Sequence, residues 1–295
     1  MTHARANMLL LTAGAIWGMG FVSQQTAMEH VGPWFFIAIR FAIAALAMLP
    51  LALREIAKAG RRVHGDEYGK FALIGLFFFL GNGAQQVALL TTSVTNAGFL
   101  TALYLIIVPI LSIALFRQPP HWVIWPSSAL ALFGIYLLSG GKFDSLSTGD
   151  LLTILCAAFW AVQILLIGRF GRESRLPVTL TVVQFAVTAL LAAPVMLALE
   201  RIDLYAALLA APEILFSGVV AGGLAFTFQT VGQQHTSAPQ AAIFLSSEAL
   251  FAAFFGVLIQ NDSLPLIGWL GCALIFCAIL STELVPAWLA KRRAD

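Results

Sequence analysis

The sequence predicts an all-α integral membrane protein, with ten transmembrane helices that form two inverted five-helix repeats and both termini in the cytoplasm. The composition, a succession of apolar runs and an internal repeat each support this prediction. Of the 295 residues, 60% are hydrophobic and only 10% are charged, and the mean hydropathy is +0.91. These values lie far outside those of water-soluble domains, so we expect the chain to lie within a lipid bilayer.

Ten runs of mostly apolar residues place the expected helices. Each is close to the length of about 20 residues that a helix needs to cross roughly 30 Å of hydrocarbon. The shortest connections hold only a few residues, so we expect function to lie within the helix bundle. The runs are 8–27, 33–53, 70–90, 96–116 and 121–140 in the first half, and 149–169, 177–199, 212–233, 238–259 and 265–286 in the second.

Each run of the first half has features of its own. The first follows Arg5 and lacks a clear small-residue cleavage site, so we expect a retained helix rather than a cleaved signal peptide. The second contains Arg40, the third a group of amides that begins at Asn82, and the fourth Tyr104. The fifth contains the apolar sequence FGIYLL, which ends at Leu138.

The runs of the second half follow in a similar order. The sixth contains Trp160, the seventh Gln184, and the eighth a second group of amides that includes Gln229. The ninth contains Glu248, and the tenth holds two of the three cysteines. Because the cysteines are odd in number and lack metal-ligand spacing, we expect them to pack as small core residues, with no metal site.

The basic residues indicate the orientation in the membrane. Only Lys142 and Arg201 fall on one side of the ten-span arrangement, and the positive-inside rule makes the other, basic side cytoplasmic. We therefore expect a multi-pass protein of the cytoplasmic (inner) membrane. The net charge of +2 is spread over loops and implies no nucleic-acid partner. The basic residues on the cytoplasmic side are Arg5, Arg54, Lys58, Arg61, Arg62, Lys70, Arg117, Arg169, Arg172, Arg175, Lys291, Arg292 and Arg293.

A shift of about 144 residues aligns the two halves of the chain. Because each half holds five spans, an odd number, the second must enter the membrane from the opposite face. Inverted repeats of this kind are common in secondary transporters; a chance register among many Ala, Leu and Phe residues is the alternative. The matches are Phe41 with Phe185, Pro50 with Pro194, Gln85 with Gln229, Thr92-Ser93 with Thr236-Ser237, Trp125 with Trp269 and, one residue out of step, Trp17 with Trp160.

Several segments resemble the drug/metabolite transporter superfamily, specifically its ten-helix branch with two EamA-type repeats. They are GAIWG at Gly14–Gly18, Arg40, TNAGFLTALYLIIVPILS at Thr95–Ser112, and Trp125–Leu138. The resemblance covers nearly the whole chain and implies repeats at 1–144 and 145–295. Within the superfamily the chain is most similar to amino-acid exporters, including those for aromatic amino acids. That similarity implies export from the cytoplasm by alternating access.

The chain also departs from the common pattern of that superfamily. Gln184 stands where the first repeat has Arg40, and Ala249 follows Glu248 where a proline is frequent. The acidic residue often found after the fourth and ninth spans is absent near Gln118 and Gln260. The coupling mechanism and the substrate therefore do not follow from the resemblance.

Amide and hydroxyl side chains inside the spans are candidates for the wall of a substrate cavity, because polar groups in hydrocarbon require a partner or a wet surface. An amide both donates and accepts hydrogen bonds, which suits a zwitterion. The alternative is that each amide joins neighbouring helices, for about 1 kcal/mol. The candidates are Asn82, Gln85, Gln86, Gln163, Gln229, Gln233 and Ser247.

Aromatic residues near the middle of the spans extend this set. Trp17, Tyr104, Trp160 and Phe228 are candidates to stack on an apolar or aromatic substrate, with bulky packing as the alternative for each.

Arg40 and Glu248 are the charges well within expected spans. Glu248 lies near mid-membrane and could carry a coupling proton, receive a substrate ammonium group, pair with Arg40 or bond Ser246 and Ser247. Arg40 could act in the structure, at a gate or on the substrate, or reach toward the external interface.

Glycines beside the amides are candidate hinges. Gly81 and Gly83, with Gly222 and Gly223 in the second half, could permit bending where a gate requires it. Close packing is the alternative, and small residues such as Gly14 and Gly18 let helices approach each other.

Other function classes receive less support. No Walker-type phosphate loop, HExxH or GxSxG motif is present, so we expect neither ATP-driven transport by this chain nor an enzyme. One alternative is an intramembrane hydrolase, whose active-site groups could be Ser246, Ser247 and Glu248. Another is a channel formed by the same helices. We expect a small-molecule substrate, an amino acid first of all, and the lipid bilayer as partners, with no cofactor and no protein partner implied.

Overall fold

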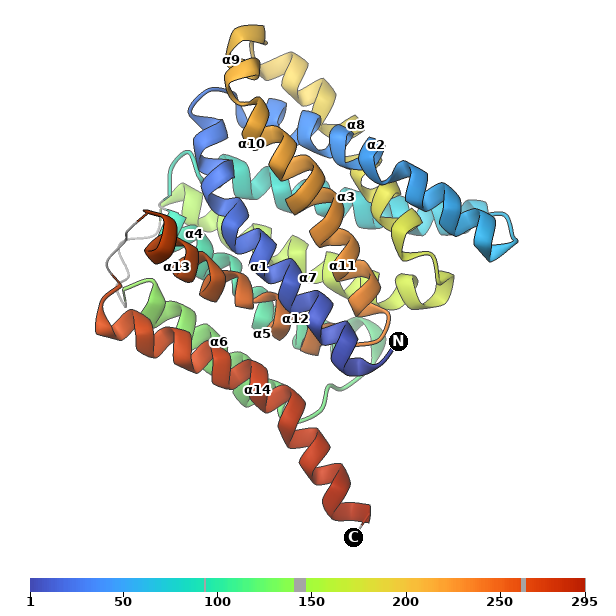
Figure 1. The fold of residues 1–295 in the computed structure, drawn as a ribbon, viewed down its shortest axis with the longest axis vertical. Helices are drawn as coiled ribbons and strands as arrows, with labels where there is room; N and C mark the ends of the chain where they lie inside the picture. Colours follow the sequence, from blue (N-terminus) through green and yellow to red (C-terminus); the bar gives the residue numbers. More distant parts are fainter. Residues whose placement is uncertain (93, 141–146, 261–263, 295) are drawn as a thin grey trace.

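The computed structural model describes the chain except for residues 93, 141–146, 261–263 and 295, and the part it describes is helical without a strand (Figure 1). Several further side chains within helices are not described either: those of residues 21–22, 25, 94–95, 259–260, 290–291 and 293–294. The expected boundary between 144 and 145, Lys142 and Ser93 therefore lie outside the described residues, as do the side chains of Lys291 and Arg293.

Several helices of the first half begin or end at residues that are common at helix termini. Pro33 opens its helix at a position where a missing N–H costs nothing, and Gly60 ends that helix with a φ of 63°. Pro119 and Pro120 separate the last two helices of this half, because proline cannot continue a helix interior. The helices are α1 (His3–Met28), α2 (Pro33–Ala59), α3 (Gly65–Ala88), α4 (Val94–Thr101), α5 (Tyr104–Phe116) and α6 (Ile124–Leu138).

The second half repeats this order with additions. Ser147 caps its first helix by accepting from the Asp150 N–H, and the Asp150 carboxylate accepts from the Ser147 N–H at 2.8 Å. One span contains a π-helix, η1. The helices are α7 (Thr148–Ser174), α8 (Pro177–Leu199), α9 (Leu204–Leu209), α10 (Ala211–Leu215), η1 (Phe216–Leu224), α11 (Ala225–Gln233), α12 (Ala238–Leu245), α13 (Ser247–Gln260) and α14 (Leu266–Ala294).

Eight segments of the described chain are long and apolar enough to cross a membrane. Helical residues also lie in the other two expected ranges, as α1 and as α6, a shorter apolar helix of 15 residues. The fifth expected span, 121–140, is thus shorter than predicted, because the chain becomes helical only at Ile124 after the two prolines. We propose below that all ten ranges cross the bilayer.

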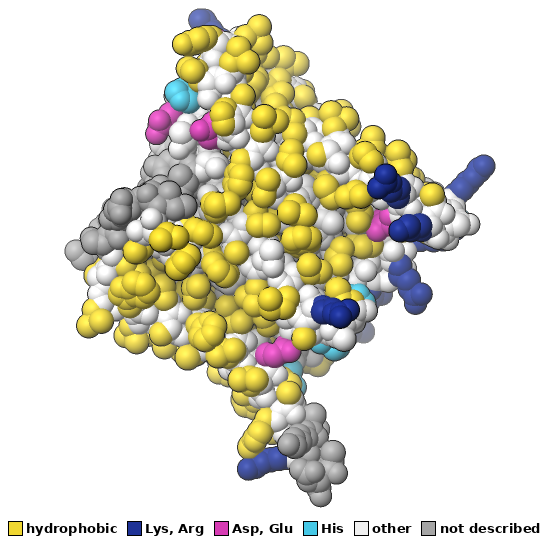
Figure 2. All heavy atoms as spheres, viewed as in Figure 1, with side chains coloured by type: hydrophobic (Ala, Val, Ile, Leu, Met, Phe, Trp, Pro, Cys, Tyr) yellow, Lys and Arg dark blue, Asp and Glu magenta, His cyan; other side chains and the backbone are white. Residues whose placement is uncertain are grey.

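Helices from the two halves pair lengthwise. In Figure 1, α2 runs beside α8 and α6 beside α14, and α3 packs on α7 while α1 packs on α13. Figure 2 shows yellow apolar side chains across the middle of the visible face, over which a bilayer would lie. Between the halves, aromatic residues form the core: Phe41, Phe78 and Phe185 are at most 1% exposed.

The fourth helix of each half is broken at an equivalent place. One break lies between Thr101 and Tyr104, and the other at Ser246, between α12 and α13. The Ser246 hydroxyl donates to the Ile243 carbonyl at 2.7 Å, a local bond that competes with the regular helix ladder. A shift of 144 carries the first break onto the second, and residues at both breaks line the cavity described next.

Candidate functional site

A cavity lies between the two halves of the protein, near the helix breaks. Its empty volume is about 710 Å³, including its open mouth. The first half contributes Trp17, Gln24, Arg40, Phe41, Asn82, Gln85, Thr101 and Tyr104 to its lining, and the second half Trp160, Ile164, Ser217, Ala221, Gly222, Phe226, Gln229, Leu245 and Glu248.

Much of the lining consists of residues that the internal repeat relates. The shift of 144 pairs Gln85 with Gln229 and Tyr104 with Glu248, and Trp17 matches Trp160 with a shift of 143. It also pairs Asn82 with Phe226, and Thr101 with Leu245. Equivalent positions of both halves thus face one central cavity, although several pairs differ in chemistry.

One end of the cavity is basic. The Arg40 Nη2 donates to Asn82 Oδ1 at 2.6 Å, and Asn82 Nδ2 donates to the Phe78 carbonyl at 2.8 Å, which fixes the amide. The guanidinium lies 4.6 Å from the ring centroids of both Phe36 and Phe41. These contacts hold the cation in place without neutralising it.

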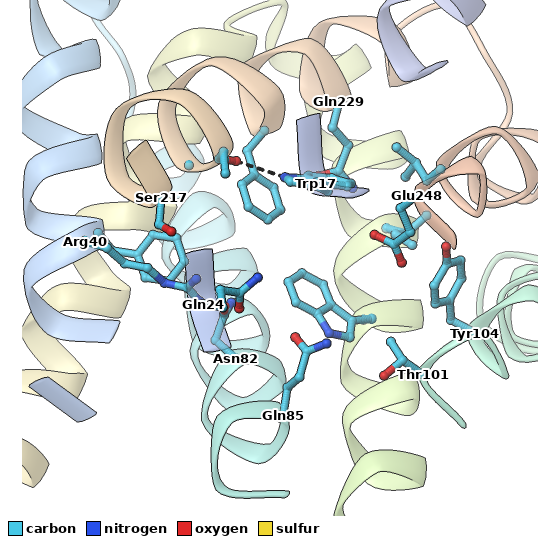
Figure 3. A pocket seen from close by; sticks show the side chains of 17 residues that line it. Trp17, Gln24, Arg40, Asn82, Gln85, Thr101, Tyr104, Ser217, Gln229 and Glu248 are labelled. Atoms are coloured by element: carbon cyan, nitrogen blue, oxygen red, sulfur yellow. Dashed lines mark hydrogen bonds between the residues drawn. The ribbon is translucent and has the colours of Figure 1, made fainter. Parts of the chain in front are cut away.

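The opposite end is acidic. Figure 3 shows Glu248 and Tyr104 across the cavity from Arg40. Because α12 breaks at Ser246, Glu248 falls in the first turn of α13, where the helix dipole favours a negative charge. Among the described residues, neither Glu248 nor Arg40 belongs to an ion pair. Their pairing was one of the predicted possibilities, and the structure shows instead that the cavity separates them.

Aromatic rings form the middle of the cavity. The Trp17 indole Nε1 donates to the Ala221 carbonyl at 2.9 Å, the dashed line in Figure 3. The Trp17 ring centroid lies 4.5 Å from that of Phe226. Phe226 also stacks on Trp160, with centroids 6.1 Å apart and an interplanar angle of 9°. Ala221 belongs to η1, and π-helical turns occur frequently at functional sites.

Five predicted residues lie outside this cavity. Gln163 and Gln233 connect helices, as Gln163 bonds Gln184 and Gln229 at 3.4 and 3.5 Å, and Gln233 donates to the Ile164 carbonyl at 3.0 Å. Gln86 is fully buried, and neither polar atom of its side chain has a hydrogen-bond partner. The Ser247 hydroxyl is buried against Gly14.

Phe228 is the fifth residue outside the cavity, and it packs on the hydrophobic core. It lies two residues after Phe226, about 200° around the helix, so the two rings face different sides. Phe226 lines the cavity and was not predicted, although its pairing with Asn82 at the repeat shift could have found it.

The predicted hinge glycines occupy two settings. Gly81 and Gly83 lie within the unbroken helix α3, where Gly83 packs against the Trp34 ring. Gly222 and Gly223 lie in η1, and Gly222 lines the cavity. A side chain at Gly218, one turn earlier, would meet the Arg40 carbonyl oxygen at 2.9 Å, so its absence lets η1 approach α2.

Three further polar residues of the cavity lining were not predicted from the sequence: Gln24, Thr101 and Ser217. Thr101 and Ser217 are small hydroxyl residues, which often bond their own helix, and Gln24 lies near the end of its run. Within the described residues, no group of three His, Cys, Asp or Glu side chains could hold a metal ion.

Comparisons with known proteins agree with this architecture. The model of the EamA-like transporter family matches residues 4–140 and again 147–283. An uncharacterized transporter of Archaeoglobus fulgidus is 29% identical over 280 residues, which is 95% of this chain and 86% of that protein. A protein of known crystal structure has a similar fold, with a TM-score of 0.80 and 18% sequence identity over 98% of this chain and 99% of its own.

Proposed function

Because the chain belongs to the EamA-like transporter family, whose members carry small molecules across membranes, we propose that it exports amino acids with aromatic or other apolar side chains. In this proposal they leave the cytoplasm by alternating access. One observation supports this choice of substrate class. The cavity has a basic side chain at one end, an acidic one at the other, and aromatic rings between them.

This arrangement is complementary to an amphipathic zwitterion. Arg40 would attract a carboxylate, Glu248 an ammonium group, and the rings of Trp17 and Phe226 an apolar side chain. Gln85 and Gln229 can donate or accept along the polar edge of the substrate. A purely cationic or purely anionic metabolite would meet one repelling charge.

Two equivalent contacts at opposite ends of the bundle support alternating access. Thr92 donates to Asp150 at 2.5 Å, which joins the end of α3 to the start of α7. Thr236 donates to Asn7 at 2.9 Å, which joins the end of α11 to the start of α1. The repeat shift relates the two pairs, as two halves that open at opposite faces would require.

In this proposal all ten expected ranges cross the inner membrane, and both termini lie in the cytoplasm. Figure 2 shows most basic side chains at the right-hand and lower edges, near the N-terminus in Figure 1, and one at the opposite end. At the basic end, Arg61 pairs with Glu67 at 2.7 Å and donates to the Ser174 carbonyl at 2.8 Å. The Glu67 bond raises the pKa of the Arg61 guanidinium, which stays charged.

The test is counterflow into liposomes that contain the purified protein and are preloaded with unlabelled amino acid. We expect saturable uptake of labelled phenylalanine, and of threonine more weakly. Gln85→Ala is expected to abolish uptake. Gln86→Ala, which removes the neighbouring amide outside the cavity, is the matched control and is expected to transport. Uptake that does not saturate would indicate a channel, and no uptake by folded protein would exclude amino acids as the substrate class.

A further inference from the structure

Arg40 is a buried cation with no anion beside it. Its side chain is 5% exposed, and no carboxylate of the described chain forms an ion pair with it. An uncompensated charge in a low-dielectric interior is costly, so such a group requires a partner that the protein itself does not supply.

The donors around Arg40 are incompletely used. Nη2 bonds Asn82, whereas Nε is enclosed and has no hydrogen-bond partner. The Ser217 hydroxyl is 2% exposed and likewise has no partner. Both residues line the cavity, and Figure 3 shows them at the same end of it. Gly218, which directly follows Ser217, lets η1 approach α2 here because an added side chain would meet the Arg40 carbonyl oxygen. A guanidinium and a hydroxyl thus lie at the same end of the cavity, and each has a donor without a partner.

We propose that Arg40 and Ser217 form a carboxylate-binding subsite that fixes the orientation of the substrate in the cavity. The proposal rests on the proposed function, which supplies the small amphipathic substrate. One cation and a few neutral donors match a single negative charge. A dianion such as a phosphate monoester would leave a charge unmatched and would face Glu248 across the cavity.

The internal repeat explains why this subsite exists only once. The position equivalent to Arg40 is Gln184, which is fully buried, bonds Gln163 at 3.4 Å and does not line the cavity. The two halves therefore differ in charge at this position, and the carboxylate binds on the α2 side only. A structural role for Arg40 alone would not predict any preference for carboxylate ligands.

The test compares two ligands of nearly equal shape, 3-phenylpropionate and neutral 3-phenylpropanol. Binding to the purified full-length protein is followed by the fluorescence of its tryptophans, two of which line the cavity. We expect the wild type to bind the carboxylate at least about tenfold more tightly than the alcohol, the size of effect that a charge-assisted contact gives. Arg40→Gln, which places the residue type of the second half at this position, is expected to bring the ratio to about one.

Ser217→Ala keeps the cation and is expected to lower the ratio severalfold. Ser128→Ala is the matched control, because that hydroxyl is also buried without a partner but lies on α6, outside the cavity lining. It is expected to leave the ratio unchanged. A wild-type ratio near one would overturn the subsite even if phenylalanine is transported. A high ratio lost in Arg40→Gln would support the subsite even if counterflow fails, so the two proposals can fail separately.

Discussion

Glu55 and Glu200 each cap the helix that carries the other. Glu55, near the end of α2, accepts from the backbone N–H groups of Val178 and Thr179 at 3.1 and 2.7 Å, in the first turn of α8. Glu200, directly after α8, accepts from those of Trp34 and Phe35 at 2.9 and 2.8 Å, in the first turn of α2. These two caps join α2 and α8 at both ends and hold them antiparallel. Because the two contacts are equivalent, they are consistent with an approximate two-fold axis between the halves.

These caps are expected to contribute separately to stability. Glu55→Ala or Glu200→Ala leaves two N–H groups of a helix start unpaired, so each should lower the free energy of unfolding by about 1–2 kcal/mol. Thermal unfolding in detergent measures this as a lower Tm. Glu29→Ala is the control, because Glu29 is exposed and no ion pair is found for it within the described chain. An equal loss of stability in Glu29→Ala would contradict the assignment.

Phe226 is expected to determine affinity for aromatic substrates, whereas Phe228 is not. Phe226→Ala removes the ring that packs between Trp17 and Trp160, so the KM for phenylalanine should rise by about tenfold, equivalent to about 1.4 kcal/mol. Phe228→Ala removes a ring of the same size two residues away, outside the cavity. Counterflow at varied phenylalanine concentration distinguishes them. A larger effect on KM from Phe228 would show that the wrong face of α11 was assigned.

Glu248 is expected to recognise the ammonium group. Glu248→Gln keeps the size of the side chain and removes its charge, so binding of phenylalanine should weaken by about tenfold while binding of 3-phenylpropionate should not weaken. Tryptophan fluorescence measures both affinities in the same samples. Equal losses for the two ligands would indicate that Glu248 maintains the shape of the cavity instead.

The equivalent contacts of Thr92 and Thr236 are expected to act in opposite directions on access. Thr92→Val breaks the bond to Asp150 and should favour opening at the external end, whereas Thr236→Val breaks the bond to Asn7 and should favour the cytoplasmic end. A single cysteine at Ala221, in a variant without the native cysteines, reports access through its reaction with an impermeant thiol reagent added outside. Thr92→Val should speed this reaction and Thr236→Val should slow it.

Thr153→Val is the control for that experiment. The Thr153 hydroxyl is fully buried and donates only within its own helix, to the Gly149 carbonyl at 2.8 Å. Its removal should leave the labelling rate unchanged. Changes in the same direction for Thr92→Val and Thr236→Val would be incompatible with two opposing gates.

Local features of the sequence explain part of the site. Asn82 and Gln85 could be predicted to face a cavity because polar groups within apolar helices require a polar environment. The same reasoning selected Gln86, which is buried away from the cavity although it directly follows Gln85. A shift of one residue rotates a side chain by about 100° around the helix, so only helix packing decides which amide lines the cavity.

By itself, the sequence determined the membrane class, the helical composition and the internal repeat, because these depend on the length and apolar character of local segments and on residues such as Gln85 and Gln229. The tertiary structure decided that Arg40 and Glu248 face one cavity from opposite ends instead of pairing. It also decided that Phe226 rather than Phe228 is in the lining, and that Glu55 and Glu200 join the halves. The physical reason is that these relations depend on how each helix is rotated and broken against partners more than 100 residues away.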